Sequence, residues 1–316
     1  MPSKSFEPIF LHDVPACVYS DSLVIADAHI GLETEILGKG SAPVFLKKNV
    51  EQIVALANEN NCKKIILLGD VKHKITAEDD FVFDFFKGLQ DFEVTIVPGN
   101  HDGSLKKYAM FHTNVKFAEQ PGMIYNNAAF AHGHTWPTEE MMQQDYLFVG
   151  HSHPAIEFVD KLESKSVQKI WLMGGLEGES EMLAKKYPNA NLKIKVIFVP
   201  AFNPLITGSA INSTREGSSA PGAARFVPRG QMRPFFGSPK NRAAKRCGDR
   251  SGGRSRWSAT ASRHRRRSAH SGGAAANDFY RAGPLLKNKL FKAAEAKIYL
   301  LNGINLGSAK NYLKTN

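Results

Sequence analysis

The sequence lacks any apolar run of the roughly 18 to 20 residues that a membrane-spanning helix needs. Its first ten residues, MPSKSFEPIF, also lack the charged leader, apolar stretch and cleavage site of a secretory signal. The three cysteines, Cys17, Cys62 and Cys247, are odd in number and form no CxxC pair, which argues against a disulfide framework and against a zinc ribbon. We therefore expect a cytoplasmic protein with reduced thiols and no membrane partner.

Arginine is missing from most of the chain. All 14 arginines lie between Arg215 and Arg281, and the segment 212–282 holds 16 basic and three acidic side chains. That segment therefore carries a net charge of +13 where the whole chain carries +11, which leaves −2 for the other residues. Because the basic character belongs to one segment, the net charge does not indicate that the rest of the protein binds nucleic acid.

The segment 212–282 also differs in its other residues. It is rich in Arg, Ser, Gly, Ala and Pro and nearly devoid of Ile, Leu and Val, so it cannot bury enough apolar surface to offset its ordering entropy. We expect a disordered insertion. Two origins remain open: a foreign or frame-shifted stretch, or a basic tether that binds phosphate backbones without sequence preference.

The remaining residues read as an α/β protein. Apolar runs typical of buried strands cover 22–27, 63–70, 92–102, 128–134 and 145–154, with helical spacing over 44–60 and 77–89. Repeated units of this kind predict a largely parallel sheet covered by helices. After residue 153, strand-like runs without intervening helices predict a second, more antiparallel sheet. We divide the chain into a catalytic domain (1–211), the insertion (212–282) and a C-terminal hairpin that turns at Asn302-Gly303 and completes the domain (283–316).

Each predicted core strand ends in polar side chains. The ends read Asp27-Ala28-His29, Gly69-Asp70, Gly99-Asn100-His101-Asp102, His132-Gly133-His134 and Gly150-His151-Ser152-His153. In open α/β sheets ligands bind beyond the carboxyl ends of the strands, so these groups are expected to form one site. Mixed oxygen and imidazole ligands suit Mn, Fe, Zn, Co or Ni, whereas Mg and Ca prefer oxygen alone.

The strand ends offer two or three carboxylates, one amide and at least four imidazoles. These seven or more candidate ligands exceed what one ion of four to six ligands can use. They suit two divalent ions that share a bridging carboxylate, and we expect Mn, with Fe, Zn, Co or Ni as alternatives. Such a pair can hold a hydroxide and clamp the oxygens of an in-line displacement at phosphorus. The chemistry that this predicts is hydrolysis of a phosphate ester.

The strings DAH, GD, GNHD, HGH and GHSH, in that order over residues 27–153, resemble the five motifs of the calcineurin-like metallophosphoesterase superfamily. The resemblance implies an α/β/β/α fold, a two-sheet β-sandwich flanked by helices, with a dinuclear site at the strand ends. The strings GDVKH, PAFNPLITG and AKIYLLNGINLG look most like the archaeal SbcD-related phosphoesterases.

The resemblance also implies roles for individual residues. Asp27, His29 and His153 would bind the first metal; Asn100, His132 and His151 would bind the second, and Asp70 would bridge them. His101 would face the scissile phosphate as a catalytic residue, and Asp102 would orient His101. His132 is preferred to His134 as a ligand because it is nearer the strand end. His134, Lys72 and His73 are candidates for contact with the substrate.

These features together predict a metal-dependent phosphoesterase. Phosphoprotein phosphatases of the superfamily hold phosphate with arginines, which this part of the chain lacks, so phosphodiesters of nucleotides or nucleic acid are the expected substrates. A metal-bridging hydroxide would attack phosphorus, with His101 assisting the leaving group. The alternative is a non-catalytic interaction module, or a nucleic-acid-binding module, on a metallophosphoesterase scaffold.

Overall fold

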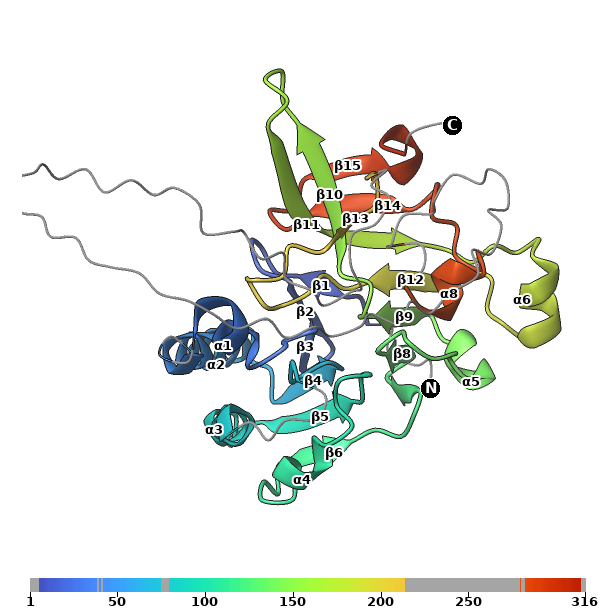
Figure 1. Ribbon diagram of the computed structural model, residues 1–316. Coiled ribbons are helices and arrows are strands. Elements are labelled where there is room, and N and C mark those ends of the chain that lie inside the picture. Colours follow the sequence, from blue (N-terminus) through green and yellow to red (C-terminus); the bar gives the residue numbers. More distant parts are fainter. Residues whose placement is uncertain are drawn as a thin grey trace, which may run out of the picture. The chain divides into compact units, whose positions relative to one another are not determined.

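The computed structural model describes residues 6–38, 40, 42–74, 80–213, 279 and 282–313, all of which belong to one compact unit. Two β-sheets lie between two layers of helices (Figure 1). The predicted α/β/β/α arrangement is therefore confirmed. None of the helices in the described ranges is long and apolar enough to cross a membrane. The predicted disorder of the insertion lies outside the described residues, and the division into three segments stays a prediction.

The first sheet has the strand order β1-β2-β3-β4-β5-β6. Its strands are β1 (Ile9–Phe10), β2 (Ala16–Tyr19), β3 (Ser22–Ala26), β4 (Lys64–Leu68), β5 (Glu93–Val97) and β6 (Val115–Phe117). The strands β3 to β6 run parallel, whereas β1, β2 and β3 pair antiparallel. The connections carry the helices α1 (Leu32–Leu37), α2 (Ala42–Glu59), α3 (Asp80–Gly88) and α4 (Lys106–Ala109). The carboxyl ends of β3, β4 and β5 therefore meet at one edge.

The second sheet has the order β13-β10-β11-β12-β9-β8-β7, and β14 pairs with both β11 and β15. Its strands are β7 (Gly122–Tyr125), β8 (Ala128–Ala131), β9 (Tyr146–Val149), β10 (Pro154–Val159), β11 (Lys165–Gly174), β12 (Lys195–Phe198), β13 (Ser209–Ala210), β14 (Lys297–Leu300) and β15 (Asn305–Ser308). The helices α5 (Glu139–Met142), α6 (Glu181–Lys186) and α8 (Gly283–Lys287) lie on its far side, and η1 (Ala309–Asn311) follows β15 (Figure 1). The hairpin predicted at Asn302-Gly303 is confirmed by the antiparallel pairing of β14 with β15.

Alternate residues of the parallel strands pack into different cores. Leu23 and Ile25 of β3 face the helices α2 and α3, where Phe85 is fully buried. Val24 and Ala26 face the second sheet instead and share a core with Phe148 and its neighbours. Strands buried on both faces require a nearly continuous apolar sequence, which explains the uninterrupted runs seen in the sequence.

One prediction about the sheets is wrong. The strands that end at His132 and His151 were expected to continue the first parallel sheet, but β8 and β9 lie in the second sheet. The chain passes from β6 in the first sheet to β7 in the second. A hairpin then pairs β8 antiparallel with β7, and its turn residues Asn126 and Asn127 both have positive φ angles, 48° and 62°. This is the conformation of a two-residue hairpin turn that asparagine tolerates, and it returns the chain without a crossover helix.

Candidate metal centre

Five of the seven candidate ligands have a left-handed backbone. Asp27 (φ 55°), His29 (42°), Asp70 (47°), His151 (65°) and His153 (44°) all have positive φ, which few residues other than glycine adopt. The turns that carry them directly follow β3, β4 and β9. The conformation aims successive side chains toward one edge of the sandwich. Such local strain is typical of functional sites.

A first cluster combines Asp27, His29 and His153, whose ligand atoms all lie within 4.8 Å of one another. Asp27 Oδ1 is 3.2 Å from His153 Nε2, and Asp27 Oδ2 accepts a hydrogen bond from the backbone N–H of His151 at 3.0 Å. His29 is 1% exposed, yet neither of its ring nitrogens has a hydrogen-bond partner. A buried imidazole without partners costs free energy unless something else satisfies it, and a metal ion fits that need.

A second cluster combines Asp70, His132 and His151 within the same 4.8 Å limit. His132 Nδ1 lies 2.8 Å from the carbonyl oxygen of Leu68, which assigns the proton to Nδ1. In the neutral form of the ring its Nε2 is then left as an acceptor; this atom lies 3.4 Å from Asp70 Oδ2 and 3.3 Å from Asn100 Oδ1. A metal-binding histidine usually has this arrangement, with its other nitrogen donating to a carbonyl group.

Asp70 lies within reach of both clusters. Its Oδ2 atom is 3.7 Å from His29 Nε2 in the first cluster and 3.4 Å from His132 Nε2 in the second. Its other oxygen, Oδ1, accepts the backbone N–H of His101 at 2.9 Å. This carboxylate is therefore the group best placed to contact two ions at once.

The charges of the clusters suit divalent cations. Burial alone would raise the pKa of the Asp70 carboxyl, but His132, His29 and the N–H of His101 hold this pKa well below its usual range. Burial lowers the pKa of His29 to about 3 and that of His151 to about 4, so both imidazoles are neutral at pH 7. His132 behaves differently, because Asp70 and Asp27 outweigh its burial and raise its pKa to about 9. The two carboxylates thus favour positive charge between them.

His101 lies beside both clusters, but its partner is not the expected one. Its Nδ1 hydrogen-bonds the carbonyl oxygen of His73, and its Nε2 is 3.9 Å from Asp70 Oδ2. Asp102 was expected to orient His101, and this is wrong: its carboxylate accepts the backbone N–H groups of Val71 and Gly99, each at 2.9 Å. Burial, with the charge of Asp70, raises the pKa of Asp102 to about 6. Asp102 therefore connects the turns after β4 and β5, and the His101 imidazole is oriented by the backbone carbonyl of His73 instead.

The three candidates for substrate contact have different surroundings. Lys72 was predicted to contact the substrate, but it is 0% exposed, so its side chain is not accessible to a substrate in this structure. His73 is partly buried, with its ring stacked on that of His101 and its Nε2 atom 3.4 Å from Glu35 Oε2. The His134 ring lies 5.2 Å from the His132 ring, outside the second cluster of ligand atoms.

Sequence reasoning missed a buried polar group next to the first cluster. Lys169 of β11 donates to two backbone carbonyls in the loop after β12, and burial lowers its pKa to about 8. Asn203 of that loop is 0% exposed and contacts the backbone at Ala28 and His29. No spacing in the sequence relates these residues to the ligand motifs, because the contacts of Asn203 with the first ligand turn span 170 or more positions, and the Lys169 ammonium contacts the loop that carries Asn203.

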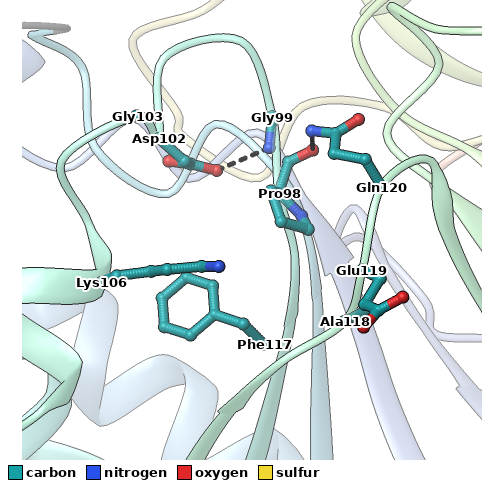
Figure 2. A pocket seen from close by; sticks show the side chains of 9 residues that line it. All are labelled: Pro98, Gly99, Asp102, Gly103, Lys106, Phe117, Ala118, Glu119 and Gln120. Carbon is teal, nitrogen blue, oxygen red and sulfur yellow. Dashed lines mark hydrogen bonds between the residues drawn. The ribbon is translucent and has the colours of Figure 1, made fainter.

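A cavity of about 290 Å³ borders the turn that carries Asn100 and His101 (Figure 2). Pro98, Gly99 and Asp102 form one wall, and Phe117 at the end of β6 forms another. Figure 2 shows Lys106 extending over the Phe117 ring, with its ammonium 5.9 Å from the ring centre. The cavity thus combines an aromatic side chain with a cation close to the candidate ligands.

Replacing Gly69 by Ala is expected to destabilise the fold by about 1 to 3 kcal/mol. Gly69 has φ +70°, and an added Cβ would lie 2.4 Å from His132 Nδ1 and 2.8 Å from the Cα of Gly99. Thermal unfolding followed by circular dichroism measures the change. Gly103→Ala is the matched control, because a Cβ at that position meets nothing within 4 Å. Equal melting temperatures for the two variants would contradict the tight packing at this turn.

The chain was compared with protein families, curated proteins and solved structures. Residues 22–174 match the family described as calcineurin-like phosphoesterase superfamily domain, and this range holds every candidate ligand. Among solved structures, a nuclease named MPE from Pseudomonas putida is 20% identical, with a TM-score of 0.44, covering 66% of this chain and 92% of that one. A protein of unknown function from Aquifex aeolicus is 19% identical, with a TM-score of 0.28, covering 42% of this chain and 78% of that one. No curated protein matches the sequence significantly.

Proposed function

We propose, from the family match over residues 22–174 together with the two clusters that meet at Asp70, that this chain is a metal-dependent phosphoesterase. The position of Asp70 between the clusters carries the proposal, since one carboxylate in reach of two sets of imidazoles is what a dinuclear centre requires. The closer resemblance to archaeal SbcD-related phosphoesterases stays a prediction.

The proposed ligands are divided by cluster. Asp27, His29 and His153 would hold the first ion; Asn100, His132 and His151 the second, with Asp70 shared. The orphaned nitrogens of His29 and the acceptor nitrogen of His132 support this division. Two divalent ions, Mn in our proposal, would polarise the phosphoryl oxygens and lower the pKa of a water molecule.

His101 is the proposed catalytic residue. Because its Nδ1 is engaged by the His73 carbonyl, its Nε2 points to the Asp70 side of the site. With Nδ1–H donated to that carbonyl, Nε2 carries a proton only in the imidazolium form, and in that form Nε2–H would be donated to the oxygen of the leaving group or to a non-bridging phosphoryl oxygen, leaving a neutral ring. His73 and His134 lie near enough to be proposed as further contacts of the substrate.

Phosphodiesters are the proposed substrate class. The sequence outside 212–282 has no arginine, so the bidentate forks that suit a phosphate dianion are missing from the matched domain. A diester carries a single negative charge and needs less compensation. The cavity beside Asn100 could receive a substituent of the diester, where a nucleobase would meet the Phe117 ring and a neighbouring phosphate would meet Lys106.

The test is hydrolysis by protein treated with chelator and reloaded with Mn. We expect no turnover after chelation, recovery with Mn, and faster hydrolysis of bis-p-nitrophenyl phosphate than of the monoester p-nitrophenyl phosphate. Single- and double-stranded DNA are assayed as well, because they are natural phosphodiesters of the proposed substrate class. Turnover that survives chelation would overturn the metal-dependent function, and a preference for the monoester would overturn the substrate class.

A further inference from the structure

A buried polar network lies behind the first cluster. It connects Lys169 on β11 and Asn203 after β12, both associated with the second sheet, to Glu33 in α1 and to the turn after β3. Asn203 and Glu33 are 0% and 2% exposed. Polar groups this deeply buried destabilise a protein unless their hydrogen bonds are satisfied, so the geometry of the network is tightly constrained.

Lys169 holds the loop after β12 at two points. Its ammonium donates to the carbonyl oxygens of Ala201 and Asn203, each at 2.7 Å. Between these residues, the N–H of Phe202 donates to the carbonyl of Ala26 at 2.8 Å, the last residue of β3. The ammonium therefore fixes a short segment of the second half of the chain against the end of β3.

Asn203 extends this connection to the ligand turn itself. Its Nδ2 lies 2.9 Å from the carbonyl oxygen of Ala28, 3.3 Å from that of His29 and 3.0 Å from Glu33 Oε1. Glu33 in turn accepts the backbone N–H of Gly31 at 3.0 Å through its other oxygen. The turn that presents Asp27 and His29 is thus held through the backbone carbonyls of Ala28 and His29.

We propose that Lys169 and Asn203 are positioning residues that set the affinity of the first metal site. They fix the left-handed turn from Asp27 to His29, so that the Asp27 carboxylate and the buried His29 imidazole are aimed at the same point before metal binds. The inference rests on the proposed dinuclear function. It assigns the effect to the first site because, among the described residues, Asn203 and Phe202 contact the backbone of Ala26, Ala28 and His29.

The experiment compares Mn binding by wild-type protein and by Lys169→Met, using isothermal titration of the chelator-treated full-length chain. We expect one of two binding phases to weaken about 10-fold to 100-fold, as is usual when a group that orients a ligand is removed. The other phase stays unchanged. Saturating Mn should restore kcat, and the melting temperature without metal should fall by no more than the loss of a donor to two carbonyl oxygens predicts.

Asn203→Ser is a second variant, in case Lys169→Met folds poorly, because serine is small and its hydroxyl is too short to reach both carbonyls. Lys165→Met is the matched control: Lys165 lies on the same strand with its side chain 46% exposed and paired with Glu157. Unchanged Mn affinity in both test variants, or an equal loss in both phases, would overturn the inference. Two Mn ions bound by wild-type protein without any hydrolysis would refute the proposed function and leave the positioning role open to the same comparison.

Discussion

Asp70→Asn is expected to lower kcat for bis-p-nitrophenyl phosphate by about 10³-fold or more, which corresponds to about 4 kcal/mol. The amide retains the shape of the side chain but removes the negative charge that lies within 3.7 Å of both His29 and His132. Without that charge neither of the two proposed ions would bind as tightly, so both ions would be lost from the site together. The measurement is steady-state hydrolysis with Mn, together with metal content determined on the same sample.

The control for this variant is Asp91→Asn. Asp91 is exposed and precedes β5, at the edge of the first sheet opposite to the site. Its replacement should leave both turnover and metal content as in wild-type protein. If Asp70→Asn retained two ions and near wild-type turnover, the bridging position assigned to Asp70 would be wrong.

His101→Ala is expected to lower kcat by roughly 10² to 10⁴, the range typical of general acid catalysis, with unchanged metal content. Metal content should hold because His101 is not among the proposed ligands, which the two clusters and Asn100 supply. His12→Ala, at a side chain that is 71% exposed, should have no effect and serves as control. A loss of bound metal in His101→Ala would mean that His101 is a ligand and not a catalytic residue.

The leaving group separates two roles of His101. A p-nitrophenolate leaves without a proton, whereas an alkoxide needs one, so proton donation predicts a larger loss for an alkyl phosphodiester than for bis-p-nitrophenyl phosphate. Stabilisation of charge on the phosphoryl oxygens predicts similar losses for both substrates. The ratio of the two losses therefore assigns the step in which the Nε2 proton takes part.

The strand ends could be predicted because the chemistry of the site is local in the sequence. Asp27, Asp70 and Asn100 each follow an apolar run, and parallel strands bring their carboxyl ends to a common edge. The same runs did not reveal which sheet each strand joins. Four-residue strands buried on every side, such as β8 and β9, look alike in either sheet, and the asparagine pair at residues 126 and 127 indicates only the turn between β7 and β8.

The partners of individual side chains could not be predicted in the same way. Asp102 follows His101 directly, yet consecutive residues in a turn point in different directions, and the carboxylate bonds the backbone of Val71 and Gly99. Lys169 and Asn203 contact groups that are brought close only by the packing of the two sheets. Such contacts depend on the tertiary structure and leave no periodic pattern.

The left-handed turns lower the stability of the fold, and this affects how the site can evolve. Five candidate ligands occupy a conformation that disfavours side chains by about 1 kcal/mol each, a sum comparable with the lower end of a whole domain's stability. Selection for thermal stability alone would favour glycine or asparagine at these positions, so the carboxylates and imidazoles persist only while catalysis or metal binding is selected. Relatives that have lost hydrolysis are expected to drift toward glycine first at the positions equivalent to 27, 29, 70, 151 and 153.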